Sequence, residues 1–165
     1  TNGNTITAAG LGLQAGGNIS DTAGPSAAGE LDFNVTSLAF DAGNDFVVQD
    51  TAGGVTIVNS VTGFNETVTT NSGGDSGRNI RVETAAGGQI TVDATNGLAH
   101  SGGTAGGIDL VSNGNIALTN GALSGSDLVL SAANNITQTG GTINVANLGI
   151  QATGDVGATD RKSVV

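Results

Sequence analysis

A segment in the second half of the chain repeats itself with a period of twenty residues. From Ile108 to Gly157 the sequence reads IDLVSNGNIALTNGALSGSD, then LVLSAANNITQTGGTINVAN, then LGIQATGDVG. Self-similarity at a fixed period of this length is typical of solenoids, in which each repeat forms one layer and buries its apolar face against its neighbours. The segment therefore predicts stacked layers rather than one closed core.

Aligned in twenties, the repeats show apolar columns separated by polar positions. Alternation with a period of two indicates β-strands. Gly121 and Gly141 share a column and suit corners between strands, because glycine readily adopts positive φ. The residues expected to form an inward-facing stack are Ile108, Leu128 and Leu148, then Leu110, Leu130 and Ile150, and finally Ile116, Ile136 and Val156.

A polar column accompanies the apolar ones and contains Asn115, Asn135 and Asp155. Stacked Asn side chains can form hydrogen bonds in register along the axis of an assembly of parallel strands. We interpret this column as a structural ladder rather than a binding site.

Upstream of Ile108, the same sequence pattern recurs with irregular spacing. It reads LGLQAGGNI from Leu11, LAFDAGNDF from Leu38 and IRVETAAGGQI from Ile80. The 42 residues from Leu38 to Ile80 fit two layers with a small excess, and the 28 from Ile80 to Ile108 fit one layer with an insertion. Residues 69–79 and 99–107 are rich in turn-forming residues, so we expect both segments to be loops.

These patterns predict an all-β fold, a parallel β-helix of about 20-residue turns with loop insertions. Residues 1–157 would form one domain, and residues 158–165 a tail of different composition. A hairpin at Asn113-Gly114 is the competing interpretation, because Asn-Gly between two alternating runs favours a two-residue β-turn. A sandwich of hairpins would need larger side chains, whereas aromatic residues here amount to four Phe. The constant columns favour stacking.

Charge and composition limit the classes of partner that the chain can bind. Fourteen acidic and four basic residues give a formal net charge of −10, so the chain would repel nucleic acid and anionic membrane surfaces. No run of apolar residues approaches the roughly 20 needed to span a bilayer, so no membrane insertion is expected. Cysteine is absent, which excludes disulfides.

The sequence predicts no catalytic site, and we expect no enzyme activity. His100 is the single histidine and reads as a polar loop residue, while Asp41, Asp45 and Asp50 read as surface carboxylates. No cofactor is expected. Calcium-binding rolls need a G-G-x-G-x-D spacing that this chain lacks, which leaves only weak calcium sites at Asp75 or Asp109.

The segment DLVLSAANNITQTGGTINVANLGIQATGDV resembles the repeat region of filamentous-haemagglutinin-type exoproteins, the long adhesins of two-partner secretion and related autotransporter-like bacterial surface proteins. The resemblance spans most of residues 5–157 and implies a right-handed parallel β-helix that projects as an extracellular or cell-surface fibre. It carries over no functional residue.

We therefore expect a structural or adhesive module. Its partners would be adjacent turns of the same or neighbouring chains, including a homopolymer that grows end to end, and a host or matrix glycan. The alternative is a carbohydrate-binding or polysaccharide-degrading β-helix. That alternative predicts a groove lined by the 69–79 and 99–107 insertions, with converging acids or Arg78 and Arg81.

Overall fold

The computed structural model describes residues 5–20, 30–62, 67–69, 74–76, 79–85, 87–100 and 106–158, and these ranges contain strands and no helix. The predicted all-β class is therefore confirmed. No described segment is a helix able to cross a membrane. The strands are β1 (Ile6–Ala15), β2 (Leu31–Ala42), β3 (Phe46–Asp50), β4 (Gly54–Ile57), β5 (Ser60–Thr62), β6 (Thr67–Thr69), β7 (Gly74–Ser76), β8 (Ile80–Thr84), β9 (Gln89–Asp93), β10 (Leu98–His100), β11 (Gly107–Ser112), β12 (Ile116–Asn120), β13 (Ala122–Ala132), β14 (Ile136–Gln138), β15 (Thr142–Ala152) and β16 (Val156–Ala158).

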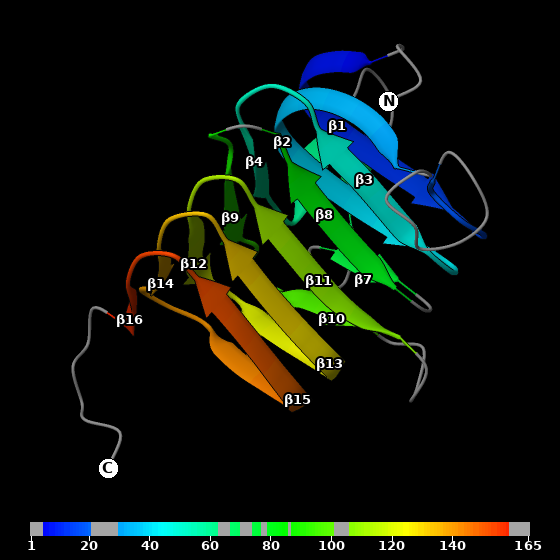
Figure 1. The fold of residues 1–165 in the computed structure, drawn as a ribbon. Helices are drawn as coiled ribbons and strands as arrows, with labels where there is room; N and C mark the ends of the chain where they lie inside the picture. Colours follow the sequence, from blue (N-terminus) through cyan, green and yellow to red (C-terminus); the bar gives the residue numbers. More distant parts are fainter. Residues whose placement is uncertain are drawn as a thin grey trace.

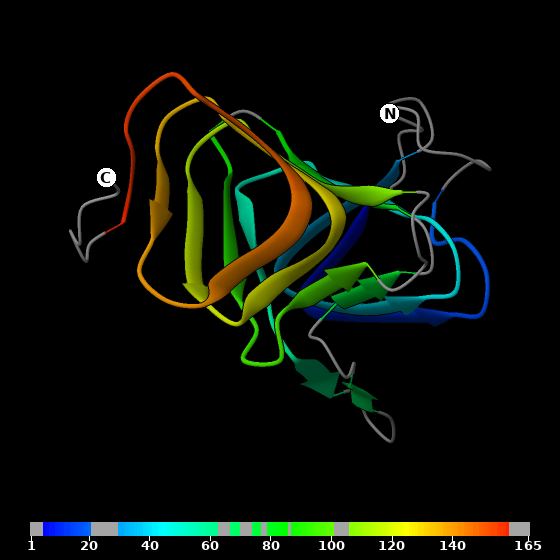
Figure 2. The ribbon, with the colours of Figure 1, turned by 90° about the horizontal axis from the view of Figure 1, so that it is seen from below.

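One parallel sheet of fourteen strands contains all of these elements except β5 and β6. The sheet is strongly curled, as Figure 2 shows in the view from below. It consists of three rows of paired strands. Successive strands along the chain belong to the first, second and third row in turn. Figure 1 shows the first two rows side by side. The first row runs β2, β3, β8, β11, β13, β15; the second β2, β4, β9, β12, β14, β16; the third β2, β7, β10, β13, β15.

The long strands β13 and β15 belong to two rows each, because they continue around a corner. Their pairing keeps a constant offset of twenty residues from Ala122↔Thr142 to Ala132↔Ala152. The same offset joins β11 to β13 and β14 to β16. The register thus places side by side the residues that the sequence repeat aligns: Ile108, Leu128 and Leu148; Leu110, Leu130 and Ile150; Ile116, Ile136 and Val156.

The interior of the curled sheet is a continuous apolar core. In the C-terminal half it consists of aliphatic columns, with Leu110, Leu130 and Ile116 fully buried. In the N-terminal half aromatic side chains fill the same space. The rings of Phe40 and Phe46 stack with centroids 3.5 Å apart and planes inclined by 6°. Aliphatic side chains suffice elsewhere because the layers are close enough for their side chains to pack directly against one another.

Glycine is required at the corner that contains Gly121 and Gly141. Both have positive φ, 82° and 73°. A Cβ at Gly121 would lie 1.8 Å from the carbonyl oxygen of Ala94, and one at Gly141 would lie 1.8 Å from that of Gly121. The column therefore combines a left-handed backbone with close backbone contact between layers.

The Asn113-Gly114 hairpin is not formed. Strand β11 pairs with β8 and β13, whereas β12 pairs with β9 and β14. Neither Asn113 nor Gly114 has the positive φ that a type I′ turn needs. The segment is instead a corner between two rows.

The first predicted insertion differs from expectation. Residues 74–76, expected to be loop, form β7, which pairs with β2 and β10 in the third row. The additional residues between β4 and β7 include an antiparallel hairpin of β5 and β6, which projects from the side of the sheet (Figure 2). The assignment of two layers between Leu38 and Ile80 is also wrong, because Ile80 pairs with Phe46 and Leu38 pairs with Ile57.

The second predicted insertion, 99–107, is shorter than expected. Residues 99 and 100 belong to β10 and Gly107 begins β11, while residues 101–105 lie outside the described residues. At the C-terminal end, β16 includes Ala158, the first residue of the predicted tail. The rest of that tail lies outside the described residues.

Candidate functional site

The polar column at Asn115, Asn135 and Asp155 forms a ladder of hydrogen bonds from backbone to side chain. Oδ1 of Asn115 accepts a hydrogen bond from the backbone N–H of Asn135 at 3.1 Å, and Oδ1 of Asn135 accepts one from that of Asp155 at 2.8 Å. The N–H groups of Ile116 and Ile136 donate to the carbonyl oxygens of Asn135 and Asp155. These bonds satisfy backbone groups at the corner that no strand pairing reaches.

A second ladder, which the sequence analysis missed, lies near the N-terminus. Oδ1 of Asn18 accepts from the backbone N–H of Asp45 at 3.2 Å, and Nδ2 of Asn79 donates to Oδ1 of Asp45 at 2.6 Å. Ile19 N–H donates to the carbonyl of Asp45. The sequence units align Asn18 and Asp45 with Asn115, but the strand pairing places them at another corner, where the chain enters the first row at Phe46 and Ile80.

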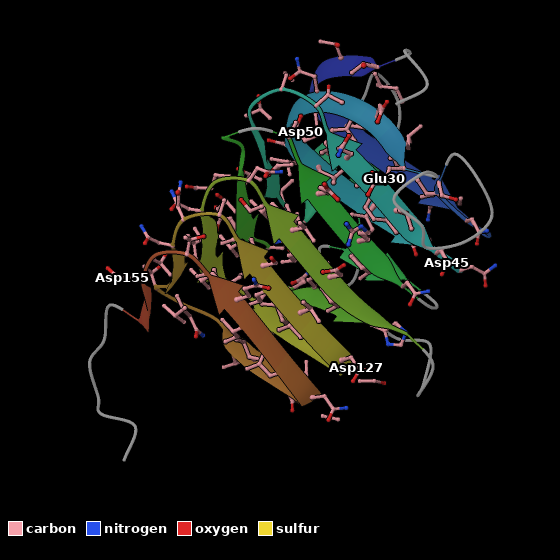
Figure 3. All side chains as sticks on the ribbon, in the orientation of Figure 1. Glu30, Asp45, Asp50, Asp127 and Asp155 are labelled. Atoms are coloured by element: carbon pink, nitrogen blue, oxygen red, sulfur yellow. The ribbon has the colours of Figure 1, made fainter. Side chains whose placement is uncertain are left out.

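The interpretation of Asp45 and Asp50 as surface carboxylates is wrong. Both residues are buried. Asp50 accepts hydrogen bonds from the backbone N–H groups of Ala52 at 3.3 Å and Gly54 at 2.6 Å, so its carboxylate closes a corner. Charge burial is tolerated here because each carboxylate receives hydrogen bonds. Figure 3 shows Asp45, Asp50 and Asp155 at separate corners, so they form no joint acidic site.

The last layer exposes the apolar columns. Leu148, Ile150 and Val156 are 48%, 44% and 56% exposed, whereas their counterparts one layer earlier are buried. The expected inward positions are thus in register but uncovered, because no described strand lies beyond β15 and β16. This end of the sheet therefore presents both unpaired strand edges and apolar side chains.

The outward-facing side of the first row of strands, called the outer wall below, carries an ion cluster around Arg81 on β8. Nε of Arg81 lies 3.1 Å from Oε1 of Glu30, and Nη2 lies 2.6 Å from Oε2 of Glu83. Nη1 pairs with Asp109, the residue beside Arg81 on the neighbouring strand β11. One guanidinium therefore holds three carboxylates together across the wall.

The pKa of Glu30 is raised above its usual value. Burial of the carboxyl is the main cause, and the charge of Glu83 adds to it, while the hydrogen bond and charge of Arg81 act in the opposite direction. Burial would lower the pKa of Arg81, but the carboxylates of Asp109, Glu30 and Glu83 outweigh it and raise that pKa. The guanidinium stays charged and is occupied by the protein's own acids.

An open pocket of about 470 Å³ lies beside this cluster, where the two insertions rejoin the sheet. Asn79 and Gly107 form one side, Asp109 and Asp127 contribute carboxylates, and Val129 supplies an apolar edge. No aromatic side chain is among the lining residues. The described part of the outer wall thus has a pocket near the place where the carbohydrate alternative predicts a groove. Arg81, however, is paired with three carboxylates and is not free to hold the carboxylate of a substrate. Arg78 lies outside the described residues.

His100 is not a loop residue. It ends β10 and is buried in the interior, and neither ring nitrogen has a hydrogen-bond partner within the described structure. Its Cβ lies against Gly125, where an added Cβ would come within 2.9 Å of it. Within the described residues, no hydrogen bond holds the imidazole in the way that a carboxylate holds the histidine of a catalytic triad.

The residues that the structure describes contain no group of three or more His, Cys, Asp or Glu side chains arranged to hold a metal ion. Asp109 is engaged by Arg81. The side chain of Asp75, the other expected weak calcium ligand, lies outside the described residues.

Comparison of the chain with known proteins found no matching family model, curated protein or solved structure.

Proposed function

We propose that the chain is a structural and adhesive module of an extracellular or cell-surface fibre, built as a right-handed parallel β-helix. The observation that carries the proposal is the constant twenty-residue register of β11, β13 and β15, which repeats one layer without adding a ligand site. Each layer's partner is the next layer, and among the described residues the unpaired edges of the fourteen-stranded sheet lie at β1, β15 and β16. Such a body extends in one direction and supports whatever is attached to it. The resemblance to filamentous-haemagglutinin-type repeats supports the same function.

Small-angle X-ray scattering of the monomer tests the extended body. We expect an elongated particle whose length changes little between low and moderate ionic strength, because the layers are joined by backbone hydrogen bonds rather than by surface charge. Fusion of the chain between a surface anchor and an epitope tag tests the display role. A tag whose distance from the surface varied as widely as that of a tag on a flexible Gly/Ser linker would contradict it.

The second candidate is a carbohydrate-binding or polysaccharide-degrading β-helix, and the pocket beside Arg81 is the observation that favours it. Its polar groups could bind sugar hydroxyls, although stacking platforms are missing from its lining. A glycan array tests it, with Asp127→Asn as the pocket variant and Asp155→Asn as a variant outside the pocket. Specific binding that only Asp127→Asn removes would support this candidate.

A further inference from the structure

We propose that Asn120, the last residue of β12, is a site of spontaneous deamidation, at which the side-chain amide is lost and an aspartyl or isoaspartyl residue takes its place. The proposal goes beyond the fibre function, because it assigns a chemical modification to one residue of the body. It rests on the hydrogen bond that the backbone N–H of Gly121 donates to Oδ1 of Asn120 at 3.0 Å.

The reaction needs a backbone nitrogen that can reach the side chain of the preceding asparagine. Hydroxide or another base removes the proton of Gly121 N, and the nitrogen forms a bond to Cγ of Asn120 while the Cγ–Nδ2 bond breaks, so that ammonia leaves and a cyclic imide remains. Water then adds to either carbonyl carbon of the imide and breaks the bond between that carbon and the nitrogen, which gives aspartate or isoaspartate. Glycine favours the attack because no Cβ crowds its nitrogen.

The geometry at Asn120 brings the reacting groups together. The N–H of Gly121 already points at Oδ1, the atom bonded to Cγ, so the electron pair that remains after loss of the proton is directed at the carboxamide. Nδ2 of Asn120, the leaving group, has no hydrogen-bond partner among the described residues. Asn120 is exposed and Gly121 is half-buried, so water and base reach the site.

The previous layer contains a matched site that lacks this geometry. The tripeptide Thr-Asn-Gly occurs at 95–97 and again at 119–121, and its asparagine is exposed in both places. The two glycines have similar φ, 87° and 82°. The N–H of Gly97, however, donates to the carbonyl oxygen of Ala94 at 2.7 Å, and Gly97 is buried. That hydrogen bond must break before the nitrogen can attack.

A third Asn-Gly pair is held even more firmly. The N–H of Gly114 donates to Oγ of Ser112 at 3.1 Å, and Nδ2 of Asn113 donates to the carbonyl oxygen of Thr84 at 2.6 Å. Both the attacking nitrogen and the leaving group are therefore engaged. The fourth pair, at 2–3, lies outside the described residues. Of the three described pairs, the proposed site is the one whose glycine N–H points at the carboxamide that it attacks.

The product would disturb the corner that follows β12. Asn120 pairs with Asp93 on β9 beside a shift in register, and both residues are exposed. A carboxylate at position 120 therefore places two like charges on neighbouring strands, which is unfavourable. Isoaspartate also adds a methylene to the main chain directly before Gly121, where even a Cβ would lie 1.8 Å from the carbonyl oxygen of Ala94. Either product should weaken the end of the β9–β12 pairing.

Peptide mapping by mass spectrometry after incubation at pH 8 tests the site, with an isoaspartyl-specific methyltransferase as a second probe. The three described pairs are measured in the same sample, so each molecule carries its own controls. Loss of one backbone hydrogen bond corresponds to about a tenfold change in rate. We therefore expect the folded chain to deamidate at Asn120 at least about tenfold faster than at Asn96 or Asn113. A rate at Asn120 no higher than that at Asn96 would overturn the proposal.

The same measurement in urea separates the effect of the fold from that of the local sequence. Unfolding removes the hydrogen bonds of Gly97 and Gly114, so the three rates should become similar. A preference for Asn120 that persists in urea would show that the fold does not select the site, and would overturn the structural argument.

Ser112→Ala tests the protecting hydrogen bond without altering Asn120. The substitution removes the acceptor of the Gly114 N–H, so the rate at Asn113 should rise relative to the rate at Asn96. Because any general loosening of the body would act on both sites, equal changes at Asn113 and Asn96 would contradict the role assigned to the hydrogen bond.

Asn120→Asp tests the consequence, since it creates one product directly. Its urea midpoint should lie below that of the wild type, and the loss should shrink at high ionic strength because salt screens the repulsion from Asp93. The double variant Asp93→Asn/Asn120→Asp has a single carboxylate at this pair and should recover the midpoint relative to Asp93→Asn. A midpoint of Asn120→Asp equal to that of the wild type would refute the weakening of the corner.

Discussion

Asn135 receives a hydrogen bond through its Oδ1 from the backbone N–H of Asp155, its counterpart one repeat later, at 2.8 Å. The acceptor is a side chain and the donor is backbone, so the ladder needs only an Oδ1 at each step. Asp provides that atom as well as Asn does. In the first half of the chain, Asn18 likewise accepts a hydrogen bond from the backbone N–H of Asp45, whose own Oδ1 accepts one from Nδ2 of Asn79.

Removal of one ladder acceptor should destabilise the chain by about 1 kcal/mol, because Asn135→Ala leaves the N–H of Asp155 without its partner. Asn134→Ala is the control, since Asn134 precedes it in the sequence and its side chain is exposed. We expect that control to change the free energy of unfolding by less than about 0.5 kcal/mol. Urea denaturation of both variants measures the difference, and equal losses would refute the role of the ladder.

Substitution of Gly121 should be costly for two reasons, its positive φ and its close contact with another layer, and a comparison with Gly87 separates them. Gly87 and Gly121 both have positive φ, 78° and 82°, but a Cβ at Gly87 meets nothing within 4 Å, whereas one at Gly121 meets the carbonyl oxygen of Ala94 at 1.8 Å. Gly87→Ala should therefore cost only the left-handed strain of about 1–2 kcal/mol. Gly121→Ala should cost about 4 kcal/mol or fail to fold. Thermal unfolding of the pair checks this, and similar losses would exclude the contact as the cause.

The sequence analysis succeeded where the repeat is regular. From Ile108 onward the spacing is constant, so a column found in one repeat fixes the register of the next, and alternation identifies the inward face. Which inward residues are covered depends on their place in the stack, and the repeat alone does not contain that information. Leu128 and Leu148 therefore look alike in the sequence but differ in exposure.

The first half of the chain was harder to predict because insertions shift the phase between layers. The offset is 34 residues between Phe46 and Ile80, and the β5–β6 hairpin occupies part of the excess. Asp50 was misassigned for another reason. A carboxylate before a turn reads as a solvated residue, whereas this one accepts backbone hydrogen bonds inside a corner, a local pattern that Asp favours.

Glu30 should make the stability of the chain fall as the pH rises. Its pKa is raised in the folded state, so the folded chain binds this proton more tightly than the unfolded chain does. The stabilisation is complete below the unfolded pKa, near 4.5, and is lost as the pH rises through the higher folded pKa. Glu30→Gln keeps an oxygen acceptor for Arg81 and removes the titration.

Urea denaturation between pH 4 and pH 7 measures this effect as the difference between wild type and Glu30→Gln. We expect the variant to gain stability relative to wild type as the pH rises through this window. Asp127→Asn serves as the control for the general change in net charge, since Asp127 is not among the three carboxylates paired with Arg81. A difference between wild type and Glu30→Gln that is independent of pH would contradict the role of Glu30.

His100 and Thr84 should respond in opposite directions when each is made apolar. Both are buried, but the ring nitrogens of His100 have no hydrogen-bond partner among the described residues, whereas Thr84 Oγ1 donates to the carbonyl oxygen of Gly88 at 2.8 Å and accepts from the N–H of Asn113 at 3.2 Å. A buried polar group without a partner opposes folding, so His100→Leu should raise the free energy of unfolding by about 1 kcal/mol. Thr84→Val has the same shape as the original side chain and loses both bonds, so it should lower that free energy by about 1–3 kcal/mol. Chemical denaturation at pH 8 measures both variants, and a loss of stability in His100→Leu would show that the imidazole has a partner or a packing role in the folded chain.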